Sequence, residues 1–107
     1  MARKSSRRPA AVIDCADLDK AGVLRALDAA FGLGEQFGAN FDALYDGMAE
    51  LIQEKGGFEL ELDNWSARRM TRKSAETLLA VFSELAEEFG PGHVRVRVIS
   101  FRCFCYL

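Results

Sequence analysis

The segment Phe58-Glu59-Leu60-Glu61-Leu62-Asp63 alternates strictly between apolar and acidic residues. A period of two is typical of a β-strand that buries one face, because successive side chains of a strand point to opposite sides of the sheet. We therefore expect a strand over residues 58–63. Patterns typical of helices lie on both sides of it in the sequence, which indicates a mixed α/β protein.

Two further strands are predicted, one before this segment and one after it. The run 10–15 has β-branched residues at its centre, and residues 94–98 alternate between valine and arginine. Helical crossovers between successive strands favour parallel pairing, because parallel neighbours need a long connection. The three strands are therefore expected to form one parallel sheet.

The helices are expected between these strands. Apolar residues recur at spacings of three and four over 20–31, 41–55 and 74–89, and a short basic helix is expected over 67–73. Asn40 is a favourable N-cap for the second of these helices. The sequence thus predicts a single small α/β domain with a three-stranded parallel sheet packed with about four helices.

The chain of 107 residues has the length of one domain. Residues 1–9 carry four basic and no acidic side chains and are expected to be a disordered tail. Residues 10–100 contain the predicted elements. Residues 101–107 form a hydrophobic extension, and the sequence leaves open whether it extends the last strand, folds back over the sheet or contacts another chain. Neither a signal peptide nor a membrane span is indicated, so we expect a cytoplasmic protein.

The charge is distributed unevenly along the chain. Residues 10–107 contain 10 basic and 16 acidic side chains, a net charge of −6. Such a surface repels nucleic acid and anionic membranes and attracts basic proteins. A basic protein is therefore the expected kind of partner, with no direct binding of nucleic acid or membrane.

Four carboxylates lie on one face of the predicted helix 41–55. They recur every four residues, while an apolar stripe follows the opposite face. Like charges at this spacing cost roughly 0.2–0.5 kcal/mol per pair. A solvated face more often mixes both signs, so we favour a recognition face over a bland surface. The four carboxylates are Asp42, Asp46, Glu50 and Glu54.

No catalytic arrangement is indicated. The single histidine, His93, has no partner in the sequence that would make it a general base, and the three cysteines do not complete a metal site. Asp42, Asp46 and Glu50 suggest a Mg²⁺-dependent phosphoester enzyme as an alternative. On one helix face, however, they are expected to lie on convex surface. We therefore expect a non-enzymatic protein without cofactor or metal.

A nine-residue motif connects the chain to a known family. Gly38-Ala39-Asn40-Phe41-Asp42-Ala43-Leu44-Tyr45-Asp46 resembles the motif of the barstar family, protein inhibitors of barnase-type ribonucleases. Residues 78–84 are similar to the last helix of that family. The resemblance implies a three-stranded parallel sheet with helices. It also implies a one-to-one complex in which an acidic helix and the loop before it block a ribonuclease active site, with carboxylates in place of RNA phosphates.

Individual site residues follow from this resemblance. Asp46 matches the aspartate that enters the phosphate site of the enzyme, and Asp42 matches one that pairs with an arginine. Gln36 stands where the family has an interface tyrosine, which leaves open a related role as an immunity protein against a different nuclease toxin. The implied partner-binding residues are Gln36, Phe37, Gly38, Asn40, Asp42, Tyr45, Asp46 and Glu84.

Overall fold

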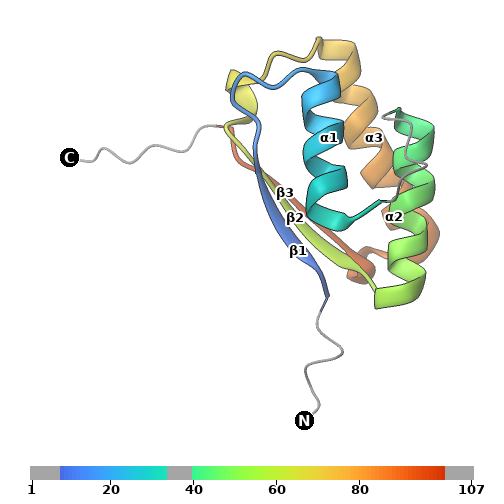
Figure 1. Cartoon of the computed structure of the whole chain (residues 1–107). Helices are drawn as coiled ribbons and strands as arrows, with labels where there is room; N and C mark the ends of the chain where they lie inside the picture. The colour runs from blue at the N-terminus through green and yellow to red at the C-terminus, as the bar shows by residue number, and fades with distance from the viewer. Residues whose placement is uncertain (1–7, 34–39, 101–107) are drawn as a thin grey trace.

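A computed structural model describes residues 8–33 and 40–100. In these ranges three α-helices lie on one face of a three-stranded sheet (Figure 1). The architecture confirms the predicted α/β domain. The elements, with η for a 3-10 helix, are β1 (Ala10–Asp14), α1 (Lys20–Phe31), α2 (Phe41–Lys55), β2 (Phe58–Asp63), η2 (Trp65–Ala67), α3 (Arg72–Phe89), η3 (Pro91–His93) and β3 (Val94–Val98).

The strand β2 is the centre of the sheet and pairs in parallel with both neighbours. Leu60 lies opposite Ala11 of β1 and Val96 of β3. The alternation in β2 works as predicted, because its apolar side chains are buried under the helices. On the other face, Arg97 Nη1 lies 3.6 Å from Glu61 Oε1.

The hydrophobic core lies between the sheet and the helices. Phe58 is fully buried, and its ring meets the rings of Phe31 and Phe82 edge-on at centroid distances of 5.7 and 6.0 Å. Each helix contributes one buried stripe. The fully or almost fully buried residues of these stripes include Val23, Leu24 and Leu27 of α1, Leu44, Met48 and Ile52 of α2, and Leu78, Phe82 and Leu85 of α3.

Side chains and glycines define the helix ends. The carboxylate of Asp19 accepts the N–H of Gly22 at the start of α1, at 2.8 Å. The amide oxygen of Asn40 accepts the N–H of Ala43 at the start of α2, at 2.7 Å. Gly56 ends α2 in the left-handed region, where glycine has no steric penalty. The predicted bounds of α1 and α2 are confirmed.

The basic helix predicted over residues 67–73 is wrong. The chain forms the short turn η2 and then runs extended, and α3 begins at Arg72. Two contacts explain the difference. The guanidinium of Arg68 stacks over the ring of Trp65 at 4.7 Å and donates to its carbonyl oxygen, and the Thr71 hydroxyl caps α3 by accepting the N–H of Ser74. The described residues therefore contain three α-helices and two 3-10 turns.

The predicted terminal segments lie mostly outside the described residues. Arg8 and Pro9 are described, and both contact the domain: Arg8 Nη1 donates to the carbonyl of Gly92, and Glu59 N–H donates to the carbonyl of Pro9. Residues 101–107 are outside the described part. Within the described ranges, no helix combines the length and the apolar character needed to cross a membrane.

Of the two glycines that follow α2, Gly57 should tolerate substitution less well than Gly56. Its φ is 144°, and an added Cβ would lie 2.5 Å from the carbonyl oxygen of His93. We expect Gly57→Ala to lower the free energy of unfolding by about 2–4 kcal/mol. Gly56→Ala, at φ 86° with no atom within 4 Å, should cost only about 1 kcal/mol. Urea unfolding of both variants measures this, and equal losses would contradict the steric explanation.

Candidate functional site

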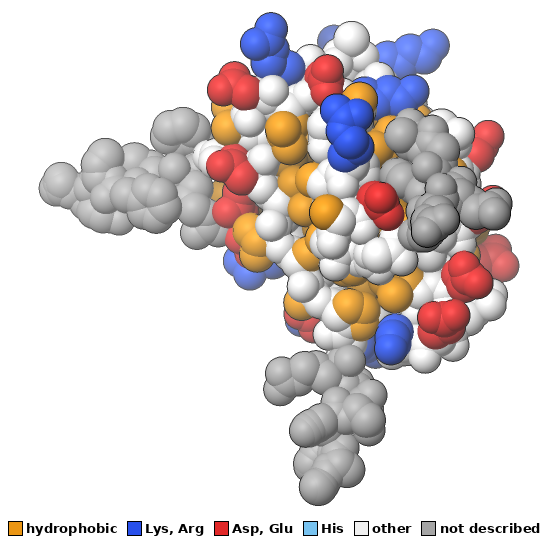
Figure 2. All heavy atoms as spheres, in the orientation of Figure 1, with side chains coloured by type: hydrophobic (Ala, Val, Ile, Leu, Met, Phe, Trp, Pro, Cys, Tyr) orange, Lys and Arg blue, Asp and Glu red, His pale blue; other side chains and the backbone are white. Residues whose placement is uncertain are grey.

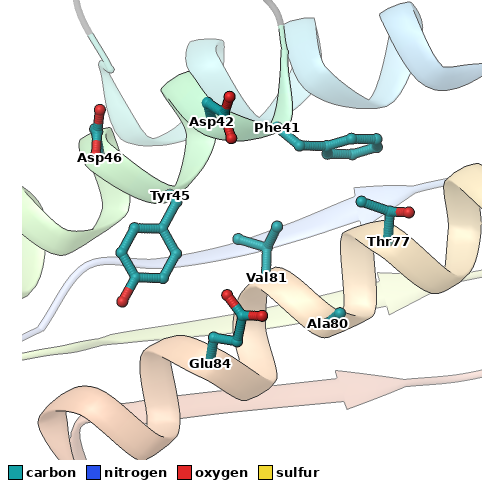
Figure 3. Close-up of a pocket in the computed structure, with 8 residues that line it drawn as sticks. All are labelled: Phe41, Asp42, Tyr45, Asp46, Thr77, Ala80, Val81 and Glu84. Carbon is teal, nitrogen blue, oxygen red and sulfur yellow. The ribbon is translucent and has the colours of Figure 1, made fainter.

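A groove of about 490 Å³ lies between α2 and α3 (Figure 3). Its lining comes equally from the two helices, which pack against each other. This geometry corrects the expectation of a convex surface, because two of the predicted carboxylates stand at the edge of a hollow. The lining residues are Phe41, Asp42, Tyr45 and Asp46 of α2, and Thr77, Ala80, Val81 and Glu84 of α3.

The helical repeat explains why these residues meet. On α3, residues 77, 80, 81 and 84 follow the spacing of one helix face. Val81 is buried and forms part of the floor, whereas Asp42, Asp46 and Glu84 are exposed. In Figure 3 the Tyr45 ring extends from α2 toward α3, and both aspartates stand on α2 away from the floor. The groove therefore has an apolar floor and an acidic rim.

No cationic side chain among the described residues forms an ion pair with the acidic rim. The ion pairs in this part of the chain join Arg72 to Glu76 and Arg97 to Glu61, and neither involves a carboxylate of the groove. Lys20 is close to the groove, but its Nζ lies over the ring of Phe41 at 4.8 Å from the centroid. The rim carboxylates are thus available to cations of another molecule.

The acidic side chains around Tyr45 affect the pKa of its hydroxyl. Partial desolvation raises the pKa of its hydroxyl, and the negative charges of Glu88, Glu84 and Asp46 raise the pKa further. A tyrosine hydroxyl is protonated at neutral pH even at its ordinary pKa, and the upward shift keeps it so to higher pH, so it can donate a hydrogen bond. An aromatic side chain with a polar tip is well suited to an interface that is apolar at the centre and wet at the rim.

The acidic stripe of α2 is divided by the structure. Asp42 and Asp46 line the groove, whereas Glu50 and Glu54 line a separate hollow of about 50 Å³ beside Leu33. The sequence pattern placed all four on one face and could not make this distinction. The difference arises because α3 borders only the first half of the stripe.

Figure 2 shows acidic and basic side chains distributed over one face of the molecule, with apolar atoms between them.

The described residues on either side of the segment 34–39 are held by hydrogen bonds to side chains. Residues 34–39, which include the predicted site residues Gln36, Phe37 and Gly38, lie outside the described part of the chain. At one end, the N–H of Leu33 donates to the carboxylate of Asp28 at 3.0 Å. At the other end, the cap by Asn40 begins α2. Sequence reasoning had no account of Leu33 as a boundary of this loop.

The packing of Leu33 against α2 explains why a glycine stands at position 47, inside this helix. An added Cβ at Gly47 would lie 3.2 Å from Cδ2 of Leu33, so the glycine lets this leucine pack closely on α2. A glycine inside a helix costs roughly 0.5–1 kcal/mol relative to alanine. The contact accounts for a residue that otherwise only weakens the helix.

The side chains of Cys15 and His93, which could be reactive, lie outside the groove. Cys15 is fully buried, and burial, followed by the charges of Asp14 and Asp63, raises the pKa of its thiol to about 11. The ring nitrogen Nδ1 of His93 lies 2.7 Å from the carbonyl oxygen of Gly56, at the C-terminal end of α2. Among the described residues, no three His, Cys, Asp or Glu side chains are grouped so that they would hold a metal ion.

The fold and the groove together describe a small α/β protein with an acidic-rimmed groove between two helices. Comparison with protein-family models matches residues 9–105 to Barstar (barnase inhibitor). Because this match covers nearly the whole sequence, the chain belongs to the barstar family, whose members bind ribonucleases as inhibitors. A search of curated proteins found no significant match. The family resemblance of the motif at residues 38–46 is confirmed.

The role of Asn40 as a cap can be tested separately from binding. Its amide oxygen is the acceptor for the Ala43 N–H, so Asn40→Ala should lower the free energy of unfolding by about 1 kcal/mol. Asn40→Asp keeps an acceptor at this position and should retain most of the stability. Denaturant unfolding of the two variants is the measurement, and wild-type stability of Asn40→Ala would argue against the cap.

Proposed function

We propose that this protein inhibits a basic ribonuclease of the barnase type by covering its active site. The α2–α3 groove and the loop before α2 form the contact surface, and the carboxylates of the rim occupy the positions of RNA phosphates. Membership of the barstar family supports the class of partner. The observation that carries the proposal is the acidic rim over an apolar floor, at the motif residues themselves.

The individual residues have distinct roles in this proposal. Asp46 enters the phosphate site of the enzyme, and Asp42 pairs with an arginine beside it. Tyr45 packs against the enzyme and donates from its neutral hydroxyl, and Glu84 contributes from α3 at the periphery. The loop residues Gln36, Phe37 and Gly38 complete the surface. In this proposal the residues of the groove act by occupying the active site of the enzyme, without a chemical step of their own.

The groove is made by one pair of helices, which supports a one-to-one complex. An inhibitor of this kind protects the cell that makes the ribonuclease, so the proposed location is the cytoplasm. The substitution of Gln36 for an interface tyrosine supports a second candidate, an immunity protein against a different nuclease toxin. Co-purification from the native cell, followed by identification of the bound nuclease, distinguishes the two.

Electrostatic attraction should control how fast the complex forms. The net charge of −6 over residues 10–107 favours encounter with a basic protein, and the fixed carboxylates orient it. Barnase and its inhibitor are themselves a standard example of such steering. Once the charges are paired and water is excluded by the apolar floor, release is slow.

Removal of one rim carboxylate should weaken inhibition strongly. Truncating one partner of a buried charge pair costs about 2 kcal/mol or more, so we expect Asp46→Ala to raise the inhibition constant at least about 30-fold. Glu50→Ala is the matched control, because it removes a carboxylate of the same helix that lies outside the groove. Its inhibition constant should change by less than about threefold. Titration of barnase-type ribonucleases with both variants provides the measurement.

The proposal fails if Asp46→Ala inhibits every ribonuclease that the wild type binds, and does so as strongly as the wild type. Equal losses in Asp46→Ala and Glu50→Ala would mean that net charge matters and the groove does not.

Salt should slow association more than it speeds dissociation. Mobile ions screen the long-range attraction, whereas paired charges inside the contact are screened much less. Between about 0.05 and 0.5 M NaCl we expect the association rate constant to fall roughly tenfold or more and the dissociation rate constant to change by less than about threefold. Stopped-flow mixing with the enzyme measures both rates. An association rate independent of salt would contradict the steering mechanism.

A further inference from the structure

The α2–α3 groove differs in charge between its two ends. Figure 3 shows Asp46 and Glu84 toward one end, the acidic end, and Phe41 and Thr77 at the other, the Phe41 end. Glu88 is exposed one turn beyond Glu84 on α3, and its charge acts on the same tyrosine of the groove as those of Asp46 and Glu84. The acidic end therefore gathers three carboxylates.

Two lysines lie at the Phe41 end. Lys20 is the first residue of α1, and its Nζ lies 4.8 Å from the centroid of the Phe41 ring. Lys73 stands on α3 one turn before Thr77, whose hydroxyl donates to the Lys73 carbonyl at 2.9 Å. Residues four apart share a helix face, so Lys73 continues the line of groove residues on α3. Both lysines are exposed, and neither belongs to an ion pair of the described residues.

The stability of their own helices does not explain these lysines. Both stand in the first turn of a helix, where the macrodipole favours an anion, and neither α1 nor α3 has an acid in that turn. The neighbouring acids are engaged elsewhere: the Asp19 carboxylate accepts the N–H of Gly22, and Glu76 pairs with Arg72. The two charges are thus free to meet charges of another molecule.

We propose that Lys20 and Lys73 select the partner and set its orientation by pairing with carboxylates of the ribonuclease. This inference rests on the proposed function and specifies the partner: its contact surface is basic where it meets Asp46 and Glu84, and acidic where it meets the two lysines. An enzyme with a uniformly basic contact surface would place cations against the lysines, and like charges in contact oppose binding. The reversed orientation is excluded for the same reason.

Phe41 determines where the charge of Lys20 is held. The face of an aromatic ring attracts an ammonium group, whereas a lysine without such a contact samples many rotamers. The ring of Phe41 is half-buried and lines the groove, so it holds Lys20 Nζ beside the contact surface. A charge positioned before binding loses less conformational entropy when it pairs.

Charge reversal of both lysines distinguishes this inference from simple attraction by net charge. Lys20→Glu/Lys73→Glu makes an acidic protein more acidic, so attraction alone predicts stronger inhibition of a basic enzyme. We expect the opposite, an inhibition constant raised about tenfold or more, because the new glutamates face carboxylates of the enzyme. The variant should fold, since a first-turn glutamate suits the macrodipole. Titration of barnase and other ribonucleases of its type gives the constants, and urea unfolding checks the fold.

Two variants serve as controls. Lys20→Arg/Lys73→Arg keeps both charges and should inhibit within about threefold of the wild type. Arg25→Glu/Arg95→Glu makes the same change in net charge away from the groove, on α1 and on the sheet face that the helices leave uncovered, and should not weaken inhibition. Equal weakening in this variant and in the lysine reversal would overturn the inference.

The inference and the proposed function fail in different ways. If the lysine reversal leaves the inhibition constant unchanged or lowers it, while Asp46→Ala still raises it, the partner has no carboxylates at the Phe41 end and only the inference is wrong. If the wild-type protein inhibits no ribonuclease of the barnase type, the proposed function fails and the inference falls with it.

Discussion

Phe58 connects the sheet to two helices and begins its central strand. Its ring is fully buried between Phe31 at the end of α1 and Phe82 in the middle of α3. Because β2 is paired on both sides, this cluster locates α1 and α3 relative to all three strands. The helix α2 then packs on α3 through its own buried stripe, so the position of the acidic groove depends indirectly on the ring of Phe58.

The buried stripe of α2 also decides which way its charges face. Leu44, Met48 and Ile52 are at most 4% exposed, and burial of each such side chain is worth about 1.5–3 kcal/mol. The like-charge pairs on the opposite face cost only about 0.2–0.5 kcal/mol each. Burial therefore outweighs repulsion by a wide margin. The protein can hold a row of unpaired carboxylates in a fixed orientation at small cost to its stability.

Local patterns predicted much of this molecule. The strand 58–63 and the helices 20–31 and 41–55 have the bounds that periodicity and capping residues indicate, since these signals lie within the elements themselves. The helix predicted over residues 67–73 does not form, because the stacking of Arg68 on Trp65 and the cap by Thr71 override its helical composition. The site was predictable only in part. The motif identified Asp42 and Asp46, whereas their place beside a hollow depends on the packing of a helix some 30 residues further along the chain, which no local pattern contains.

Within the described part of the chain no cation forms an ion pair with the rim carboxylates, and this matters for the proposed binding. If Asp42 or Asp46 were paired within the described structure, a partner would have to break that pair before it formed its own, and the gain would be small. The carboxylates of Asp42 and Asp46 are instead exposed on α2, next to apolar side chains such as Val81 and Tyr45. A partner that covers this floor removes water from the charges, which strengthens attraction to a correctly placed cation and penalises a misplaced one. In the proposed complex these carboxylates take the place of RNA phosphates, and their negative charge would at the same time repel RNA itself.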